Sequence, residues 1–377
     1  MTLKAFVVEL AKSMHNTGEY EIHFMCNHDE SFEETLPDYI HFHPVPMKRG
    51  ITLGGIKAIK EMKKIFNKEK FDLVQYSTPN ASCYASIAAK QTKIPVRLYC
   101  QWGIAYVGFH GLKRKIFKII EKMVCKYSTM IEPDSFGNLK FSRNEGLYDE
   151  KKSCVIWNGS ASGVNLEKFD ISKKKIWCKE IREKYSIPSD ALVYIFVGRV
   201  TRDKGINELF EASKRILATY PNTYLMLVGN NEVNETVDPT LYRWSMECER
   251  VIYCGFTNKV EKYLAASDVY VLPSYREGFG SAVIEAEAMG VPVIVSDIPG
   301  PTDAMISGKT GILTPKGDAK KLYDNMLVMY DNKDIRNEYG KNSEVFVRTS
   351  FEQKELFKMI IEDRHKMIAT KEKMLNE

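Results

Sequence analysis

The chain has 377 residues, of which 44% are hydrophobic and 27% charged, a composition typical of a soluble globular protein. Its length exceeds one ordinary hydrophobic core and predicts two domains. No apolar run approaches the ~20 residues of a membrane-spanning helix, and the first residues lack the pattern of a secretory signal peptide. We therefore expect a cytoplasmic protein that at most lies peripherally on the inner face of the cytoplasmic membrane.

Positive charge is concentrated in the first half. The whole chain has a formal net charge of +5, but residues 48–126 alone contain 17 Lys and Arg against 4 Asp and Glu. Such an imbalance favours an acidic partner, which can be an anionic membrane, a phosphorylated substrate or a nucleic acid.

The chain begins with a helical pattern at residues 3–14 and continues with a predicted strand at residues 20–26. A doubly wound α/β domain normally opens on a strand instead. We therefore expect that the first N-terminal strand is missing, through truncation or a start codon placed late, and we favour truncation.

From there on, predicted strands alternate with segments of helical periodicity. These strands span residues 71–77, 95–101, 152–158, 192–198, 223–229, 251–256, 268–274 and 291–297. The alternation indicates an α/β fold of two doubly wound, Rossmann-like domains facing a cleft, with parallel sheets covered by helices on both faces. We place the domains at residues 1–170 and 171–350, and at residues 351–377 a C-terminal helix that crosses back to the N-terminal domain.

Residues 110–128 predict an amphipathic helix. Its apolar face comprises Ile116, Phe117, Ile119, Ile120, Met123 and Val124. The basic residues around that face are Lys113, Arg114, Lys115, Lys118 and Lys122. Two interpretations stay open: the helix lies at an anionic membrane surface, or its apolar side packs on the sheet and its lysines are only solvated.

Cysteines and histidines form no clear metal-binding pattern. The eight cysteines stand singly, without a CxxC pair, and such cysteines are most often small buried apolar groups. His41 and His43 alternate on a predicted strand and share one face, but no other ligand candidate lies near them in the sequence. We therefore predict no metal site.

Three loops of the second half follow predicted strands, which is where open α/β sheets bind their ligands. The loop at residues 199–205 carries Arg199 and Lys204. The planar guanidinium of Arg199 can donate two hydrogen bonds at once and the ammonium of Lys204 is a compact positive charge, so together they suit a diphosphate. A basic loop that is only solvated and binds no ligand could have the same sequence. The next turn places Phe256 and its backbone where a flat base could lie.

The third loop, residues 275–281, combines a glutamate with two glycines and leads into a helix whose N-terminal amides can face a ligand. Glu277 precedes the helix, whereas Glu285 and Glu287 lie inside it, roughly 200° apart around its axis. The latter two therefore cannot share one target. We interpret Glu287 as a solvated or capping charge and Glu285 as an acceptor for paired sugar hydroxyls.

Two of these loops resemble motifs of a known enzyme family. The stretch EGFGSAVIE, residues 277–285, resembles the E-x7-E signature of family 4 glycosyltransferases, which are retaining enzymes of the GT-B fold. GRVTRDKG, residues 198–205, resembles their R-x4-K diphosphate loop. Residues 158–165 and 296–305 resemble segments of the branch that builds capsular polysaccharide, O-antigen and other glycans on lipid carriers.

The resemblance implies a role for each residue of these loops. Glu277, Arg199 and Lys204 would be catalytic: Glu277 would bind hydroxyls of the donor sugar, and the two cations would neutralise the departing nucleoside diphosphate without a metal. The donor-binding residues would be Glu285 for the ribose, Phe256 for the base, and Gly278, Phe279 and Gly280 through main-chain amides.

One position departs from the family pattern. Many members place a His near the cleft after the fourth N-terminal strand, and here Gln101 stands in that region, with His110 farther along. Gln101 could hydrogen-bond a donor hydroxyl or could be structural, and both interpretations stay open.

The resemblance implies a retaining transferase that moves a sugar from a nucleotide-diphosphate donor, which we expect to be a UDP-sugar, to a glycan acceptor. We expect a lipid-linked acceptor, bound by the N-terminal domain, and a role in surface polysaccharide synthesis. The alternatives are another GT-B enzyme, such as a sugar-nucleotide epimerase or a phosphorylase, or an inactive nucleotide-sugar-binding protein. A nucleic-acid partner is not expected, since the aromatic residues of the basic segment show no regular stacking arrangement.

Overall fold

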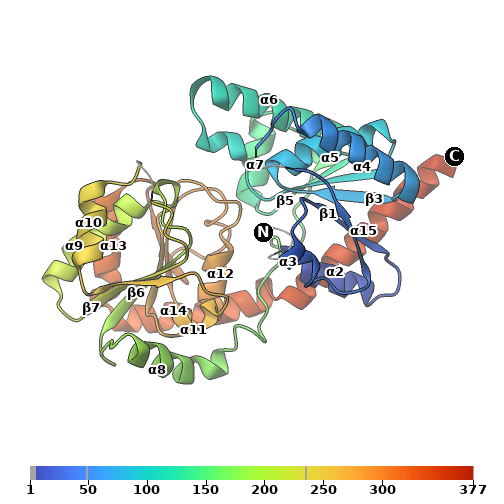
Figure 1. Ribbon diagram of the computed structural model, residues 1–377. Helices are drawn as coiled ribbons and strands as arrows, with labels where there is room; N and C mark the ends of the chain where they lie inside the picture. The colour runs from blue at the N-terminus through green and yellow to red at the C-terminus, as the bar shows by residue number, and fades with distance from the viewer. Residues whose placement is uncertain (1–5, 48–49, 234–235, 377) are drawn as a thin grey trace. The chain divides into compact units, whose positions relative to one another are not determined.

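The computed structural model describes residues 6–47, 50–233 and 236–376. The chain divides into two compact units, both seen in Figure 1. Unit 1 comprises Met1–Ser162 and Lys354–Glu377, and unit 2 comprises Gly163–Gln353.

The boundary between the units lies earlier than residue 170, where the sequence pattern places it. Backbone hydrogen bonds attach Val164, just after the boundary at Ser162, to the end of unit 2. Val164 N donates to Phe351 O at 2.8 Å, and Gln353 N donates to Val164 O at 3.0 Å. The first residues of unit 2 are therefore hydrogen-bonded to its last residues. Helix α15 (Gln353–Asn376) then continues into unit 1.

Unit 2 is built on one sheet of six strands, whose residues are mostly buried Val, Ile, Leu and Tyr. Such continuous apolar runs are typical of parallel strands between two helical layers. The strands are β6 (Leu192–Val197), β7 (Thr223–Val228), β8 (Val251–Gly255), β9 (Val269–Leu272), β10 (Val293–Ser296) and β11 (Gly311–Thr314). They pair in parallel in the order β11-β10-β9-β6-β7-β8.

Helices cover both faces of this sheet (Figure 1). One group consists of α9 (Ile206–Thr219), α10 (Pro239–Glu247) and α13 (Ala319–Asp331). The other consists of α8 (Lys174–Lys184), α11 (Val260–Ala265), α12 (Ser281–Ala288) and α14 (Lys333–Ser350). The buried residues of the sheet and both helical layers form one continuous hydrophobic core.

The strand order of unit 2 reverses at its centre, where β6 has β7 on one side and β9 on the other. After these neighbouring strands the chain continues into helices on opposite faces of the sheet, α9 after β6 and α12 after β9. In doubly wound folds this switch point is the usual ligand site. The loops in question are the two that contain the predicted motifs.

Unit 1 contains two parallel sheets among its described residues. The first pairs β1 (Ile22–Cys26) with β2 (Ile40–Pro44), and the second contains β3 (Leu73–Tyr76), β4 (Val96–Gln101) and β5 (Met130–Pro133). The helices of unit 1 besides α15 are α2 (Val8–His15), α3 (Glu30–Glu33), α4 (Gly55–Glu69), α5 (Pro79–Gln91), α6 (Gly111–Tyr127) and α7 (Phe136–Asn144). A cavity of about 750 Å³ is lined by consecutive residues of both β1 and β3. The expectation of a missing first strand stays a prediction.

Two elements predicted for unit 1 differ in their bounds or type from the observed structure. The strand predicted at residues 152–158 is wrong, because only Ser153 forms a bridge, with Ile131, and the residues after it are irregular. The helix predicted at residues 3–14 is described from Val8 onward as α2, and residues 3–5 lie outside the described residues. No helix within the described ranges is long and apolar enough to span a membrane.

Candidate functional site

The loops after β6 and β9 touch at the switch point of unit 2. Gly205, with φ of 74°, precedes α9, and a Cβ atom on it would lie 1.9 Å from the carbonyl oxygen of Pro273. The backbone of Tyr275 donates to the carbonyl of Asp203 at 2.9 Å. Only glycine permits this approach, since any side chain would both clash and take up a left-handed conformation. The two loops are thereby held in a fixed relation.

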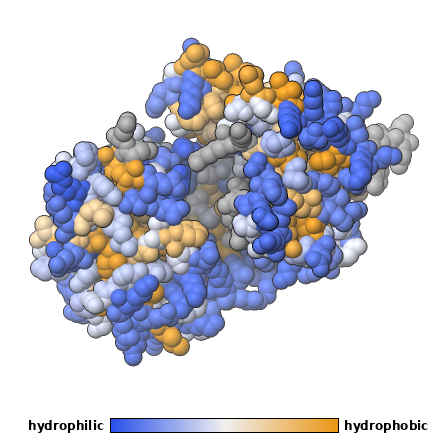
Figure 2. Space-filling model, viewed as in Figure 1, coloured by the Kyte–Doolittle hydropathy of each residue, from blue (hydrophilic) through white to orange (hydrophobic). Residues whose placement is uncertain are grey.

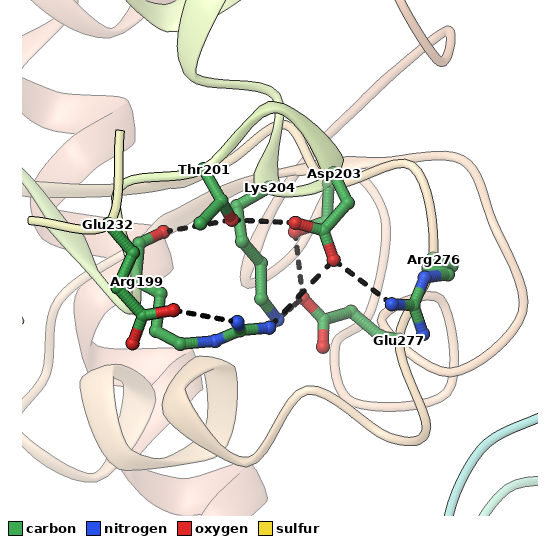
Figure 3. Close-up of polar contacts among 8 residues, drawn as sticks. Arg199, Thr201, Asp203, Lys204, Glu232, Arg276 and Glu277 are labelled. Carbon is green, nitrogen blue, oxygen red and sulfur yellow. Dashed lines mark hydrogen bonds and ion pairs between the residues drawn. The ribbon is translucent and has the colours of Figure 1, made fainter. Parts of the chain in front are cut away.

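The contact between the loops places a cation on a carboxylate. Lys204 Nζ lies 2.6 Å from Glu277 Oε1 (Figure 3). Ser274 Oγ donates to the same oxygen at 2.7 Å. The side chains of Lys204 and Glu277 are 20% and 12% exposed. Both hydrogen bonds go to Oε1, so Oε2 of Glu277 makes none to the described residues. That oxygen can accept a hydroxyl of a ligand.

Arg199 lies at the more exposed end of the same loop. Its guanidinium contacts Glu232 Oε2 at 3.1 Å and lies 3.9 Å from Asp203 Oδ2 (Figure 3). Asp203 also contacts Arg276 at 3.2 Å and accepts a hydrogen bond from Thr201 at 2.6 Å. Each cation of the predicted diphosphate site is therefore paired with a carboxylate.

Asp203 is the shared acid of this network. Burial alone would raise its pKa, but the hydrogen bond from Thr201 and the charges of Arg276, Lys204 and Arg199 together lower it. The carboxylate therefore stays ionised and orients the cations around it. Sequence analysis missed Asp203 because it read the loop only for phosphate-binding cations, although the acid stands directly before Lys204.

A second network fastens the loop to α9. Arg202 contacts Glu208 Oε2 at 2.8 Å and donates to the hydroxyl of Tyr275 at 2.7 Å, and that hydroxyl donates to Glu208 Oε1 at 2.7 Å. These three side chains satisfy one another. They support the loop, and Arg202 is therefore engaged inside the fold.

Glu285 is a half-buried carboxyl on α12 with no hydrogen bond from the described residues to its side chain. Burial raises its pKa to about 7, an effect that Lys168 opposes and Glu261 increases. Lys168 Nζ itself lies 3.9 Å from Glu261 Oε2. The Glu285 carboxyl therefore has charged neighbours but no hydrogen-bond partner among the described residues. It is left able to accept hydrogen bonds from a ligand.

The interpretation of Glu287 as a solvated or capping charge is wrong. Its side chain is fully buried, since α12 packs on α14 as well as on the sheet. Burial raises the pKa of Glu287 well above its ordinary value, and an interaction with Thr310 opposes this only partly. The helical phase separated Glu287 from Glu285 correctly, but a sequence does not reveal that the second face is covered too.

The residues between the two predicted glutamates have different roles. The ring of Phe279 is 2% exposed and packs edgewise on Phe351 at 5.3 Å, so its side chain belongs to the core. Gly280, with φ of 91°, is the residue before α12. The carbonyl of Gly278 is approached so closely by Gly300 that a Cβ on Gly300 would lie 2.2 Å from it. Only the main chain of these residues is left for a ligand.

Phe256 and Gln101 differ sharply in accessibility. Phe256 follows β8 and is 69% exposed, so its ring and backbone are open to a ligand at the carboxyl edge of the sheet. Gln101 is completely buried in unit 1, where Nε2 donates to Glu121 and Oε1 accepts from Ser142 and Tyr148. Of the two interpretations of Gln101, these contacts favour the structural one over donor binding, because its polar atoms are engaged inside the fold.

Comparison with family models matches both parts of the chain. Residues 178–346 match the model described as "Glycosyl transferases group 1", and residues 2–135 match "Glycosyl transferase 4-like". The first match contains Arg199, Lys204, Glu277 and Glu285.

Individual proteins agree with these matches. The chain is 31% identical over 313 residues to the capsular polysaccharide biosynthesis glycosyltransferase CapM of Staphylococcus aureus, covering 82% of this chain and 80% of that protein. It is 28% identical over 334 residues to the UDP-Gal:alpha-D-GlcNAc-diphosphoundecaprenol alpha-1,3-galactosyltransferase of Escherichia coli, covering 86% and 83%. The solved structure of Anabaena HepE in complex with UDP-glucose superposes with a TM-score of 0.78 at 17% identity, covering 95% of each chain, which shows a shared fold.

Proposed function

Because this chain belongs to the group 1, family 4-like glycosyltransferases with the GT-B fold, we propose that it moves a sugar from a UDP-sugar to a lipid-linked glycan. The observation that carries the proposal is the Lys204–Glu277 contact of 2.6 Å at the switch point of unit 2. A carboxylate that can bind sugar hydroxyls thereby stands beside a cation that can bind the leaving diphosphate. The names of the Escherichia coli relative and of the UDP-glucose complex support the donor and acceptor classes.

The donor diphosphate binds between the two loops in this proposal. Arg199 exchanges the carboxylate of Glu232 for phosphate oxygens, and Lys204 faces the diphosphate while it keeps Glu277 in place. The main chain at Gly278 and Gly280 adds amides in front of α12. Negative charge grows on the diphosphate as the bond to the sugar breaks, and prearranged cations lower that barrier. The reaction at this site then needs no metal.

The sugar and the ribose bind at the two glutamates of the motif. Oε2 of Glu277 accepts donor-sugar hydroxyls while Lys204 and Ser274 hold Oε1. Glu285 accepts both ribose hydroxyls, which requires its ionised form, and Phe256 lies beside the base. Unit 2 is therefore the donor-binding unit, and unit 1 binds the acceptor.

The chemistry is a front-face substitution with retention of configuration. The acceptor hydroxyl forms its new bond to the anomeric carbon on the side from which the diphosphate leaves. The electron pair of the broken carbon–oxygen bond goes to the diphosphate, and the hydroxyl proton passes to a diphosphate oxygen. Fixed positive charge at Arg199 and Lys204 stabilises this departing group.

Helix α6 is the proposed membrane contact of unit 1. Leu112, Ile116 and Ile119 are 72%, 46% and 68% exposed, and Figure 2 shows apolar surface over this helix. Lys115 and Lys122 are exposed as well, at helical spacing from those residues. An apolar stripe flanked by lysines suits the surface of an anionic bilayer, where a lipid-linked acceptor is found.

The expected apolar face of α6 divides in two. Val124 is buried, and Phe117, Ile120 and Met123 pack against the core of unit 1. The basic residues divide as well. Lys118 contacts Glu145 at 2.6 Å, Lys113 lies 4.2 Å over the ring of Phe109, and Arg114 lies 5.6 Å over that of Tyr106. Lys115 and Lys122 are therefore the cations best placed for lipid headgroups.

Nucleotide binding is tested by thermal shift with nucleoside diphosphates and nucleotide sugars. We expect UDP or a UDP-sugar to raise the melting temperature of the wild type and to do so less in Glu285→Ala. Glu287→Gln is the matched control, because it changes a neighbouring glutamate of the same helix that is fully buried and cannot reach a ligand. No stabilisation of the wild type by any nucleotide would defeat the proposed function. Transfer is then assayed with a diphospholipid-linked glycan, whose product stereochemistry tests retention.

A further inference from the structure

The two-stranded sheet of unit 1 gathers three histidines on one face. β1 and β2 are parallel, with His23 opposite His41, and His43 follows two residues along β2. Alternate residues of a strand share a face, so all three rings project to the same side. The centroid of the His23 ring lies 4.7 Å from that of His41 and 5.2 Å from that of His43.

A carboxylate completes this cluster. Glu21, directly before β1, places Oε1 3.0 Å from Nε2 of His23 and 3.5 Å from Nε2 of His41. These three atoms all lie within 4.8 Å of one another. A tetrahedral zinc ion, with bonds of about 2.0–2.1 Å, separates its ligand atoms by roughly 3.4 Å. Two of the separations already match, and the third closes by rotation of His41, whose side chain is 54% exposed.

The central imidazole is held in place from its other side. Nδ1 of His23 lies 2.9 Å from Nε2 of His43. An ion on Nε2 of His23 leaves the ring proton on Nδ1, from which it can be donated to His43. Histidine ligands of metals are commonly oriented by such a bond. Phe71 packs edgewise on the His23 ring at 4.9 Å and fixes its plane.

The cluster has one buried ligand candidate and two exposed ones. The side chain of His23 is 9% exposed, whereas those of Glu21 and His41 are 71% and 54% exposed. An ion can therefore enter from solvent, replace the proton between His23 and Glu21, and keep a water molecule as its fourth ligand. Two imidazoles and one carboxylate are ligands that zinc accepts.

We propose that Glu21, His23 and His41 form a binding site for a divalent transition-metal ion of the zinc type, oriented by His43. The site lies in unit 1, whereas the diphosphate chemistry is proposed for unit 2. It replaces the prediction of no metal site, which considered His41 and His43 without their partners. The pairing of β1 with β2 brings Glu21 and His23 beside His41. No residue spacing along the sequence predicts that pairing.

The test is calorimetric titration of Zn²⁺ into tag-free protein that has been stripped with a chelator. We expect one ion to bind per chain at this site, with affinity reduced about tenfold or more in His41→Ala, in Glu21→Gln and, through loss of orientation, in His43→Ala. His28→Ala is the matched control. His28 also contacts a single carboxylate, Glu33, at 2.6 Å, in the same unit, and its loss should leave zinc affinity unchanged.

Substitution of Co²⁺ for zinc reports the ligands directly. We expect visible absorption of a tetrahedral ion without sulfur-to-cobalt charge-transfer bands, since the eight free cysteines are not ligands in this proposal. Absence of zinc binding, equal binding by wild type and His41→Ala, or a thiolate spectrum would each overturn it. The UDP-induced thermal shift should be equal in His41→Ala and wild type, so failure of this site and failure of the proposed function are distinguishable.

Discussion

Lys204 Nζ lies 2.6 Å from Glu277 Oε1 across 73 residues of sequence. The contact joins the loop after β6 to the loop after β9, where the strand order of unit 2 reverses. The cation proposed for the diphosphate therefore also fixes the carboxylate proposed for the sugar. A change at either residue is expected to disturb both functions.

Replacement of Lys204 by Ala should lower kcat by about 10²–10³-fold, because it removes a preorganised positive charge from the departing diphosphate. Transfer rates at saturating donor measure this effect. Lys262→Ala is the control, since Lys262 forms a Lys–Glu contact of 2.7 Å with Glu180 elsewhere in unit 2. An equal loss in both variants would mean that the rate depends on general stability and not on charge at the site.

Affinity for UDP should fall as pH drops below about 7. Burial raises the folded-state pKa of Glu285 to about 7, so the carboxylate that we propose binds the ribose is ionised above that pH and protonated below it. The loss is expected to reach up to about tenfold per pH unit. The diphosphate also titrates near pH 6, so the measurement compares wild type with Glu285→Gln. Identical pH profiles would rule out a contribution from Glu285.

The same raised pKa predicts a stability effect of defined sign. An unfolded chain loses the Glu285 proton at about pH 4.3, before the folded protein does. The ligand-free wild type should therefore lose stability relative to Glu285→Gln as pH rises from about 4.3 to about 7. Denaturant titrations at several pH values measure this difference.

Gly205→Ala should destabilise unit 2 and reduce nucleotide binding. The added Cβ would lie 1.9 Å from the Pro273 carbonyl, and the residue would keep a φ of 74°. Gly308→Ala is the matched control, with a φ of 73° and no atom within 4 Å of the added Cβ. Backbone strain alone costs about 1–3 kcal/mol. Gly205→Ala should exceed its control by the cost of separating the two loops, and equal melting temperatures would contradict that contact.

The double substitution Ile116→Ser with Ile119→Ser should abolish flotation with anionic liposomes. Both side chains lie on the exposed stripe of α6 and make little contact with the core, so folding should be unaffected. The control pair is Ile176→Ser with Val345→Ser, which removes exposed apolar groups from α8 and α14. Equal, negligible flotation of the wild type with anionic and neutral liposomes would remove the membrane proposal.

Gln101→Ala should lower stability while leaving UDP affinity unchanged. Its removal leaves the buried side chains of Glu121 and Tyr148 without a hydrogen-bond partner that they have in the wild type, at a cost of about 1–3 kcal/mol per group. The exposed Gln91 provides the control for loss of a glutamine. Weaker UDP binding in folded Gln101→Ala would revive a donor-binding role for this residue.

Local patterns were sufficient for the fold class and for the motif loops. The apolar runs of β6 and β9 and the helical periodicity of α9 depend on neighbouring residues, and each motif directly follows such a run. The helical phase also separated Glu285 from Glu287 correctly. These features follow from the fixed repeats of strands and helices, which any sequence displays without reference to the rest of the chain.

Pairing and burial, in contrast, depended on segments distant in sequence. Lys204 meets Glu277 only because β6 and β9 are neighbours, and His23 meets His41 only because β1 pairs with β2. Glu287 is buried because α14 covers the second face of α12. Whether a polar side chain contacts solvent, a ligand or a partner is set by what packs against it, and that is a property of the tertiary structure alone.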